Sequence, residues 1–235
     1  MGSSTLAIVQ ARMGSTRLPG KMLLKLGKFT ILEWVLRRLK KSKQLTEIIL
    51  ATSNLSIDDS LEVVAKSLGV AVFRGSETDV LGRFVSASKK SISKNIVRVC
   101  ADNPFLDFKV IDDLIEGFTN EDYDYGFNHI PWGKNSFIDG VGVEILTKRL
   151  LEEIDELTKL PEEREHVTRF IWNHWDRYRI YSPIADEKFR FPELSLDVDT
   201  KEDYELFRTH LEDYSGLPED YEVEELISKL ISINI

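Results

Sequence analysis

The segment Leu6–Lys21, LAIVQARMGSTRLPGK, contains the pattern that decides the fold. It begins with a short apolar run, Leu6–Gln10, which is typical of a buried strand. The run passes directly into a loop with two glycines, a serine and three basic residues, Arg12, Arg17 and Lys21. Glycine lets backbone N–H groups approach an anion closely, and basic side chains add charge-assisted contacts. We therefore interpret the loop as a phosphate site; the alternative interpretation is a solvated loop with unrelated basic residues.

This loop differs from two common nucleotide-binding motifs. A Walker loop would end in Gly-Lys-Ser or Gly-Lys-Thr, and a dinucleotide loop would read Gly-x-Gly-x-x-Gly. Neither pattern occurs in the segment. In parallel α/β sheets, ligands bind beyond the carboxyl ends of the strands, which is where a loop that follows Leu6–Gln10 would lie.

Outward from this segment, short apolar runs alternate with stretches that show helical spacing. This alternation predicts an α/β fold in three layers, α/β/α, around a mostly parallel mixed sheet. The first half is expected to contain strands at 6–10, 48–52, 70–73 and 96–100, and helices at 31–43, 57–68 and 80–91. The second half is expected to contain helices at 108–118, 150–157, 164–175, 201–212 and 223–230, and strands at 123–128, 141–146, 178–182 and 194–198. We read residues 1–235 as one domain, with an inserted lobe at about 128–190.

Composition excludes several classes of protein. The net charge of −9 over 235 residues argues against a nucleic-acid binder, and no apolar run is long enough to span a membrane. The lone Cys100 rules out a disulfide framework, so a cytoplasmic location is expected. The basic residues are concentrated near the start, where the loop would form a local anion site and the group from Arg37 to Lys43 would form a solvated helix face.

Two carboxylates suggest a metal site. Asp102 follows the predicted strand at 96–100, and Asp199 follows the one at 194–198. Carboxylates from two strand ends can converge on a hard cation such as Mg²⁺. The alternative for Asp199 is a structural role at the start of the helix that Thr200 caps, with Asp203 completing a capping box.

Five ordered blocks resemble one family. Residues 11–21 resemble the signature of CTP-dependent cytidylyltransferases that make CMP-activated sugars, a family that includes the KDO and acylneuraminate enzymes. The similarity is greatest to the branch of spore coat polysaccharide biosynthesis protein F. The other matching blocks are Phe73–Leu81, Arg98–Asp107, Arg164–Thr168 and Leu196–Asp203.

The resemblance implies a nucleotide-diphospho-sugar transferase-like fold, a homodimer, and transfer of CMP from CTP to a sugar acid with release of pyrophosphate. It implies that Arg12, Lys21, Asp102 and Asp199 are catalytic and that Asp102 and Asp199 hold Mg²⁺. The CTP-binding residues that it implies are Ala11, Arg12, Gly14, Ser15, Arg17, Lys21, Arg74, Ser76 and Ala101.

The acceptor is expected under the inserted lobe. Its candidate ligands are Asn128, Asp139, Glu144, Glu165 and His166. Two departures from the branch leave the acceptor's identity open. Gly82 stands where the branch usually has an acid, and Gly142 stands where it usually has an aspartate.

Two other functions stay open from the sequence. Asp197-Val198-Asp199 resembles the Asp-x-Asp element of metal-dependent glycosyltransferases that use nucleotide-sugar donors. A catalytically silent relative that binds nucleotide as a partner subunit is the second alternative. The phosphate loop favours nucleotidyl transfer over both.

Overall fold

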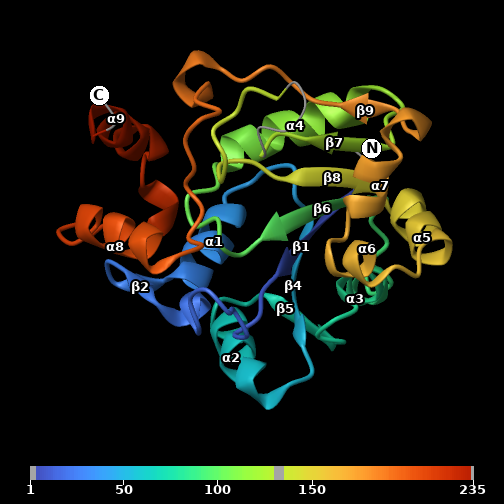
Figure 1. Ribbon diagram of the computed structural model, residues 1–235, viewed down its shortest axis with the longest axis horizontal. Coiled ribbons are helices and arrows are strands. Elements are labelled where there is room, and N and C mark those ends of the chain that lie inside the picture. Colours follow the sequence, from blue (N-terminus) through green and yellow to red (C-terminus); the bar gives the residue numbers. More distant parts are fainter. Residues whose placement is uncertain (1–3, 130–134, 234–235) are drawn as a thin grey trace.

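The central feature of the computed structural model, which describes residues 4–129 and 135–233, is a seven-stranded sheet. Within it, β8 runs antiparallel to both of its neighbours, and the other described pairs are parallel. The sheet is therefore mixed and mostly parallel, as predicted (Figure 1). In spatial order the strands are β5 (Ala71–Gly75), β4 (Glu47–Ser53), β1 (Thr5–Gln10), β6 (Asn95–Cys100), β8 (Glu144–Thr147), β7 (Tyr125–Phe127) and β9 (Ile180–Tyr181).

Strand β1 is central because both of its faces are apolar. Leu6 and Ile8 point into one core, and Ala7 and Val9 point into the other; all four are completely buried. A strand covered on both faces reads as a continuous apolar run rather than an alternating one. This is why the segment at 6–10 predicts the architecture.

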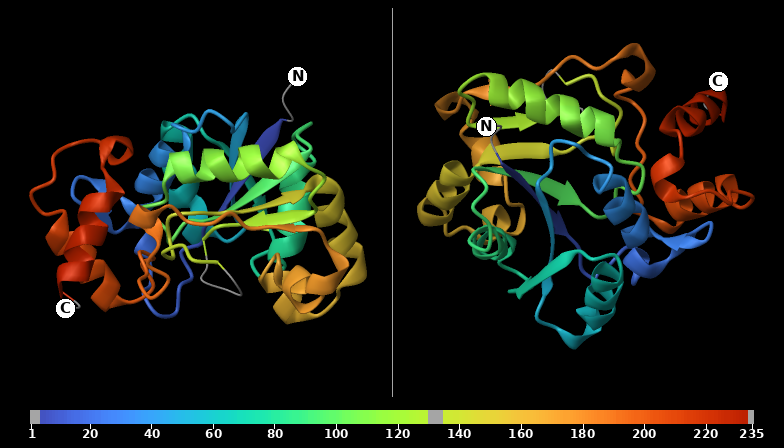
Figure 2. Two further views of the ribbon diagram at one scale, coloured as in Figure 1. Left: turned by 90° about the horizontal axis from the view of Figure 1, so that it is seen from above. Right: turned by 180° about the vertical axis from the view of Figure 1, so that it is seen from behind.

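Helices cover both faces of the sheet, which confirms the three-layer prediction (Figures 1 and 2). The core on the Ala7 face takes in residues of the helices at 31–39, 59–67 and 108–120 and of the two carboxyl-terminal helices. The core on the Leu6 face takes in residues of three others. The first set is α1 (Ile31–Leu39), α2 (Asp59–Ser67), α4 (Phe108–Asn120), α8 (Lys201–His210) and α9 (Val223–Ile233); the second is α3 (Val80–Ser88), α5 (Lys148–Leu157) and α7 (Arg169–Asn173).

Helix starts were predicted better than helix ends. Thr200 and Asp203 form the expected capping box at α8. In contrast, α1 ends at Leu39 and α3 at Ser88, three or four residues before the predicted limits. Short elements that the sequence did not reveal complete the fold: β2 (Lys25–Leu26), β3 (Phe29–Thr30) and the 3-10 helices η1 (Lys21–Leu23), η2 (Ser56–Asp58), η3 (Trp175–Arg177), η4 (Glu187–Phe189) and η5 (Pro218–Asp220).

The predicted helix at 164–175 is interrupted instead of continuous. The chain forms α6 (Pro161–Glu165) and then α7, with a break at His166 (φ −105°, ψ 70°). Beyond the break, the Thr168 hydroxyl turns inward and donates to the buried Glu144 carboxylate at 2.7 Å. A helix break that satisfies a buried carboxylate is favoured because an unpaired charge in the core is costly.

The predicted strand at 194–198 is wrong. Both edges of β6 are already paired, with β1 and β8, so the sheet offers no place beside it. The segment instead lies beyond the sheet, where the Val198 N–H donates to the Asp102 carbonyl at 2.8 Å and Ser195 forms an isolated bridge with Asp139. It still delivers Asp199 to the end of β6.

The basic group from Arg37 to Lys43 is not uniformly solvated. Arg38 is only 1 % exposed, and it donates to the carbonyls of Leu106, Pro218 and Tyr221. It therefore ties η5 and the chain before α9 to α1 and to the loop between β6 and α4.

The segment at about 128–190 belongs partly to the central sheet, to which it contributes β8 and β9. Residues 130–134 of it lie outside the described residues. Within the described ranges, no helix is both long enough and apolar enough to cross a bilayer.

Candidate active site

A cleft of about 340 Å³ lies at the carboxyl ends of β1 and β6. This is where ligands bind in open parallel sheets. The walls come from the loop after β1, the start of α3, the end of β6, the break after α6 and the segment before α8. The lining residues are Gln10, Ala11, Arg12, Ser15, Thr16, Arg17, Lys21, Met22, Val80, Arg83, Arg98, Cys100, Ala101, Asp102, Glu165, His166 and Asp199.

The segment 11–21, called the phosphate loop below, folds around the peptide of Met13. The Met13 carbonyl accepts the N–H groups of Ser15 (2.9 Å) and Gly20 (3.2 Å), and the Ser15 hydroxyl accepts the Leu18 N–H at 3.2 Å. Gly20 adopts a left-handed conformation (φ 72°), which is open to glycine at no steric cost. The turn ends at Lys21, whose side chain points into the protein.

Lys21 brings the two predicted metal-binding carboxylates together. Its Nζ atom donates to Asp102 Oδ2 (3.1 Å), Asp199 Oδ1 (3.0 Å) and the Val198 carbonyl (2.8 Å). Lys21 is 7 % exposed. Burial by itself opposes its charge, but Asp102 and Asp199 outweigh it and raise the pKa of Lys21. The ammonium is therefore positively charged and fixed at neutral pH.

The two arginines of the phosphate loop lie at the mouth of the cleft. Arg17 contacts Asp199 Oδ2 at 2.7 Å and is largely exposed. Arg12 Nη2 contacts Glu165 Oε1 at 3.3 Å, with both side chains about half exposed. Such pairs in water are weak and can exchange partners. Both guanidiniums are thus available to an anion that enters the cleft.

Further carboxylates surround the end of β6. Burial first, and then Asp197, Asp102 and Asp199, raise the pKa of Asp139 to about 7. Burial and the same neighbouring charges raise the pKa of Asp197 to about 6. In the described ranges, however, no three Asp, Glu, His or Cys side chains converge closely enough to hold a metal by themselves. Asp102 and Asp199, which share Lys21, are the pair that faces the cleft.

The floor of the cleft contains residues that sequence reasoning missed: Gln10, Arg83, Arg98 and Cys100. Arg98 Nε donates to Gln10 Oε1 at 3.2 Å, and its Nη1 atom contacts Glu144. Gln10 is the polar residue that ends the first strand, a signal that could have been used. Arg98 lies opposite Glu144 in the antiparallel pairing of β6 with β8, which no local pattern reveals.

Two predicted acceptor ligands lie in the core instead of lining the cleft. Glu144 is 0 % exposed and accepts the hydroxyls of Tyr125 and Thr168 besides contacting Arg98. Asn128, also 0 % exposed, donates to the Val110 carbonyl (2.9 Å) and accepts the Val143 N–H (2.9 Å). In this structure both side chains are occupied in packing neighbouring elements together.

The two glycines that depart from the family branch lie at close contacts. A Cβ at Gly142 would lie 2.2 Å from the Asn128 carbonyl and side-chain oxygens, so the backbones are too close for any side chain. A Cβ at Gly82 would lie 2.4 Å from Asp79 Oδ2. Asp79 is held by Arg164 Nε and Nη2, each at 2.9 Å, and this pair joins the start of α3 to α6.

The remaining predicted residues divide in two. Ala11, Ser15, Ala101, Glu165 and His166 line the cleft, and the last two are exposed at its rim. Gly14, Arg74, Ser76 and Asp139 do not line it. Arg74 donates to Ser53 and Leu55 carbonyls and to Asp59, and the Ser76 hydroxyl accepts the Asp79 N–H.

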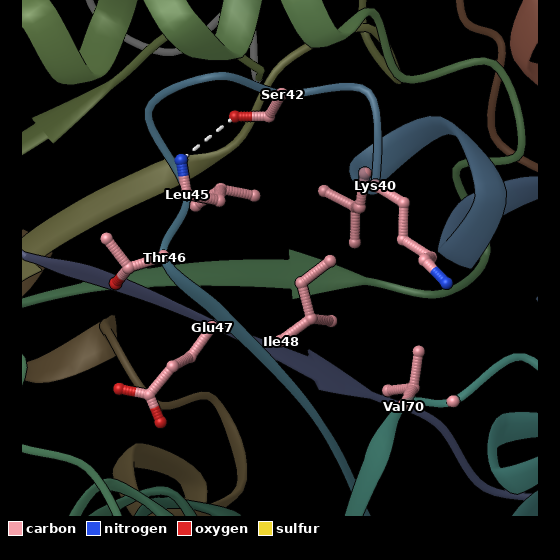
Figure 3. Close-up of a pocket in the computed structure, with 9 residues that line it drawn as sticks. Lys40, Ser42, Leu45, Thr46, Glu47, Ile48 and Val70 are labelled. Carbon is pink, nitrogen blue, oxygen red and sulfur yellow. Dashed lines mark hydrogen bonds between the residues drawn. The ribbon is translucent and has the colours of Figure 1, made fainter.

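A second hollow, of about 200 Å³, lies at the opposite ends of the strands, before β4 and β5 (Figure 3). Its polar groups already have partners. The Ser42 hydroxyl accepts the Leu45 N–H, Lys40 donates to the Leu68 carbonyl, and Glu47 accepts from Ser91. The cleft beside the phosphate loop is therefore the stronger candidate for chemistry.

The chain is similar to several known proteins over nearly its whole length. The chain is 38 % identical over 231 residues to spore coat polysaccharide biosynthesis protein SpsF of Bacillus subtilis. The aligned region covers 96 % of this chain and 93 % of that protein. A solved cytidylyltransferase from Leptospira borgpetersenii superposes with a TM-score of 0.88 at 34 % identity, over 98 % of this chain and 96 % of that one.

The fold extends to more distant structures. A CMP:2-keto-3-deoxy-manno-octonic acid synthetase complexed with CTP superposes with a TM-score of 0.67 at 16 % identity, over 88 % of this chain and 98 % of that one, which shows a shared fold. The cytidylyltransferase family model matches residues 6–229, nearly the whole chain and every wall of the cleft. Because the match spans residues 6–229, this chain belongs to the cytidylyltransferase family.

Proposed function

We propose that this protein transfers CMP from CTP to an oxygen of a sugar acid, or of a related surface-polysaccharide precursor, and releases pyrophosphate. The observation that carries the proposal is the position of Lys21, the last residue of the phosphate loop, which holds a buried positive charge between Asp102 and Asp199. In this arrangement the basic residues of the loop can bind a triphosphate, and the two carboxylates can bind a metal ion that enters with the triphosphate.

The residues present fit a magnesium ion that enters with the nucleotide. Mg²⁺ takes one or two protein carboxylates and completes its shell with water and phosphate oxygens. Asp102 and Asp199 would hold it, since they converge within hydrogen-bond reach of one Lys21 atom. When bound, the ion would neutralise triphosphate charge and make the α-phosphorus a better electrophile.

In the proposed reaction, the acceptor oxygen attacks the α-phosphorus and releases its proton to solvent, while the bond from that phosphorus to the bridging oxygen breaks and pyrophosphate leaves with that bond's electron pair. Ser15 and the loop backbone would hold phosphate oxygens. Lys21, Arg12 and Arg17 would compensate the charge that grows on the pyrophosphate. Preorganised charges of this kind supply rate because they need no reorientation during the reaction.

Two more cations favour anionic ligands in the cleft. Arg83 and Arg98 line it in addition to the basic residues of the phosphate loop, and both are largely buried. Arg98 already contacts Glu144, so Arg83 is the additional cation that an anionic substrate can meet. Glu165 and His166, at the rim, lie where acceptor hydroxyls would enter. A homodimer and a cytoplasmic location stay predictions.

Pyrophosphate release tests the proposal. The protein is incubated with Mg²⁺, each of CTP, UTP, ATP and GTP, and a panel of eight- and nine-carbon 2-keto sugar acids. We expect release that requires CTP and one class of acceptor. Release from none of the nucleotides, together with consumption of a nucleotide-sugar donor, would show a glycosyltransferase instead. Binding of CTP without turnover on any acceptor would favour the silent partner subunit.

A further inference from the structure

One buried carboxylate outside the cleft joins the phosphate loop to the sheet. Asp58, at the end of η2, is 1 % exposed and lies 45 positions from Met13 in the sequence. Its Oδ1 atom accepts the Met13 N–H at 2.7 Å. Its Oδ2 atom accepts the Thr52 hydroxyl at 2.9 Å and the Ser53 N–H at 3.1 Å, both at the end of β4.

The two oxygens of Asp58 have different partners. Oδ2 is anchored in the sheet, because the Ser53 hydroxyl also donates to it. Oδ1 is directed outward to the loop. These donors outweigh the effect of burial and hold the pKa of Asp58 below its ordinary value, so the group is an anion that only accepts. The carboxylate thus links a rigid strand to one peptide of the loop.

The N–H that Asp58 accepts belongs to Met13, the residue around whose carbonyl the loop folds. The Met13 carbonyl accepts the N–H groups of Ser15 and Gly20, and Lys21 follows Gly20 directly. A displacement of Met13 would therefore move both ends of the turn. In reactions that depend on orientation, a misplacement of about 1 Å can cost about a hundredfold in rate.

We infer that Asp58 is a positioning residue for nucleotide binding, which sets the phosphate loop and, through it, Lys21, without touching substrate. The inference rests on the proposed function for the loop's ligand, but the position of the loop can be measured without any ligand. The cleft lining does not include Asp58.

Asp58→Asn tests this role because it keeps the volume of the side chain and replaces one accepting oxygen with a donating amide nitrogen. An amide nitrogen would face either the Met13 N–H or the Ser53 N–H, so both arrangements place a donor against a backbone donor, while the Thr52 and Ser53 hydroxyls can rotate to accept. The matched control is Thr52→Val, which removes one donor from the sheet side and leaves the bond to Met13 intact.

The first readout is amide hydrogen exchange in the ligand-free protein. We expect Asp58→Asn to speed exchange at Met13, Ser15 and Gly20 by at least about tenfold, and Thr52→Val by less than about twofold. The second readout is the Kd for CTP with Mg²⁺, which should rise about tenfold in Asp58→Asn alone. Equal exchange in the two variants would overturn the inference, whatever happens to CTP.

If wild-type protein binds no CTP but exchange still rises only in Asp58→Asn, the proposed function fails and the positioning of the loop by Asp58 is supported. If Asp58→Asn does not fold, wild-type protein alone provides the test. The Met13 amide should then be as protected as the Ser53 amide, since one carboxylate holds both, and more protected than the Thr16 amide. Exchange at Met13 as fast as at Thr16 would overturn the inference.

Discussion

Lys21 Nζ lies 3.0 Å from Asp199 Oδ1, although 178 positions separate the two residues in the sequence. The same ammonium lies 3.1 Å from Asp102 Oδ2. One buried cation therefore joins the loop after β1, the end of β6 and the segment before α8. The cleft depends on this contact for both its shape and its charge.

The first prediction concerns metal affinity in the absence of nucleotide. Lys21→Met keeps the length of the side chain and removes the charge that neutralises Asp102 and Asp199. We expect Mn²⁺, used as a probe for Mg²⁺, to bind the variant at least about tenfold more tightly than wild type, because the two carboxylates lose their competing cation. Calorimetry measures this. Unchanged affinity would show that the carboxylates are not the metal site.

The second prediction separates packing from acceptor binding at Glu144. Glu144→Gln leaves Arg98 as an uncompensated charge in the core, which costs about 3–5 kcal/mol in comparable buried pairs. Thermal or urea unfolding should show a loss of this order. Wild-type stability combined with a raised KM for the acceptor would instead support the role that the sequence suggested.

The third prediction compares Arg83 with Arg74, which the sequence suggested as a CTP-binding residue. Arg83 is 3 % exposed, lines the cleft and donates to the Ser76 carbonyl at 2.6 Å. Arg74 is occupied by partners outside the cleft. Arg83→Gln should weaken CTP binding about tenfold, since it removes a charge-assisted contact. Arg74→Gln should weaken it less. Equilibrium titration gives both values, and the reverse order would place the nucleotide nearer Arg74.

The fourth prediction concerns pH. The pKa of Asp139 is about 7 in the folded protein, against 3.8 for an ordinary aspartate. The folded state then binds the proton more tightly than the unfolded state. Stability from this group is therefore present below about pH 4 and is lost as the pH rises to about 7. The shift sets an upper bound of about 4 kcal/mol, and solvent screening reduces the expected effect to roughly 1–2 kcal/mol.

Asp139→Asn removes this penalty. In a buffer with EDTA, the melting temperature of the variant should exceed that of wild type at pH 8 and approach it at pH 5. Thermal melts at four or five pH values measure the difference. A difference that stays constant with pH would contradict the raised pKa of Asp139.

The positions of some candidate residues at the cleft could be predicted because they lie on loops that follow buried strands. Asp102 lies just after β6, and Lys21 ends the basic loop that follows β1. Asp199 was predicted for a wrong reason, since residues 194–198 are held beyond the sheet by backbone bonds to Asp102 and Asp139 rather than paired as a strand. Long-range backbone bonds of this kind leave no pattern in the local sequence.

The floor of the cleft could not be predicted. Arg98 and Glu144 are 46 positions apart and meet only because β6 pairs with β8 in one register. From the sequence, an arginine in a buried strand and a later glutamate could either bind a ligand or pair with each other. The pairing of strands, which depends on long-range packing, decides between these roles.

Titration of CTP in the presence of Mg²⁺ into wild type, Lys21→Met and Lys40→Met tests the central claim most directly. Lys40 is the matched control, because its ammonium lies at the opposite ends of the strands and bonds to the Leu68 carbonyl. We predict that Lys40→Met binds CTP like wild type and that Lys21→Met binds it at least about thirtyfold more weakly. Equal affinity for CTP in the two variants would contradict the assignment of the cleft as the nucleotide site.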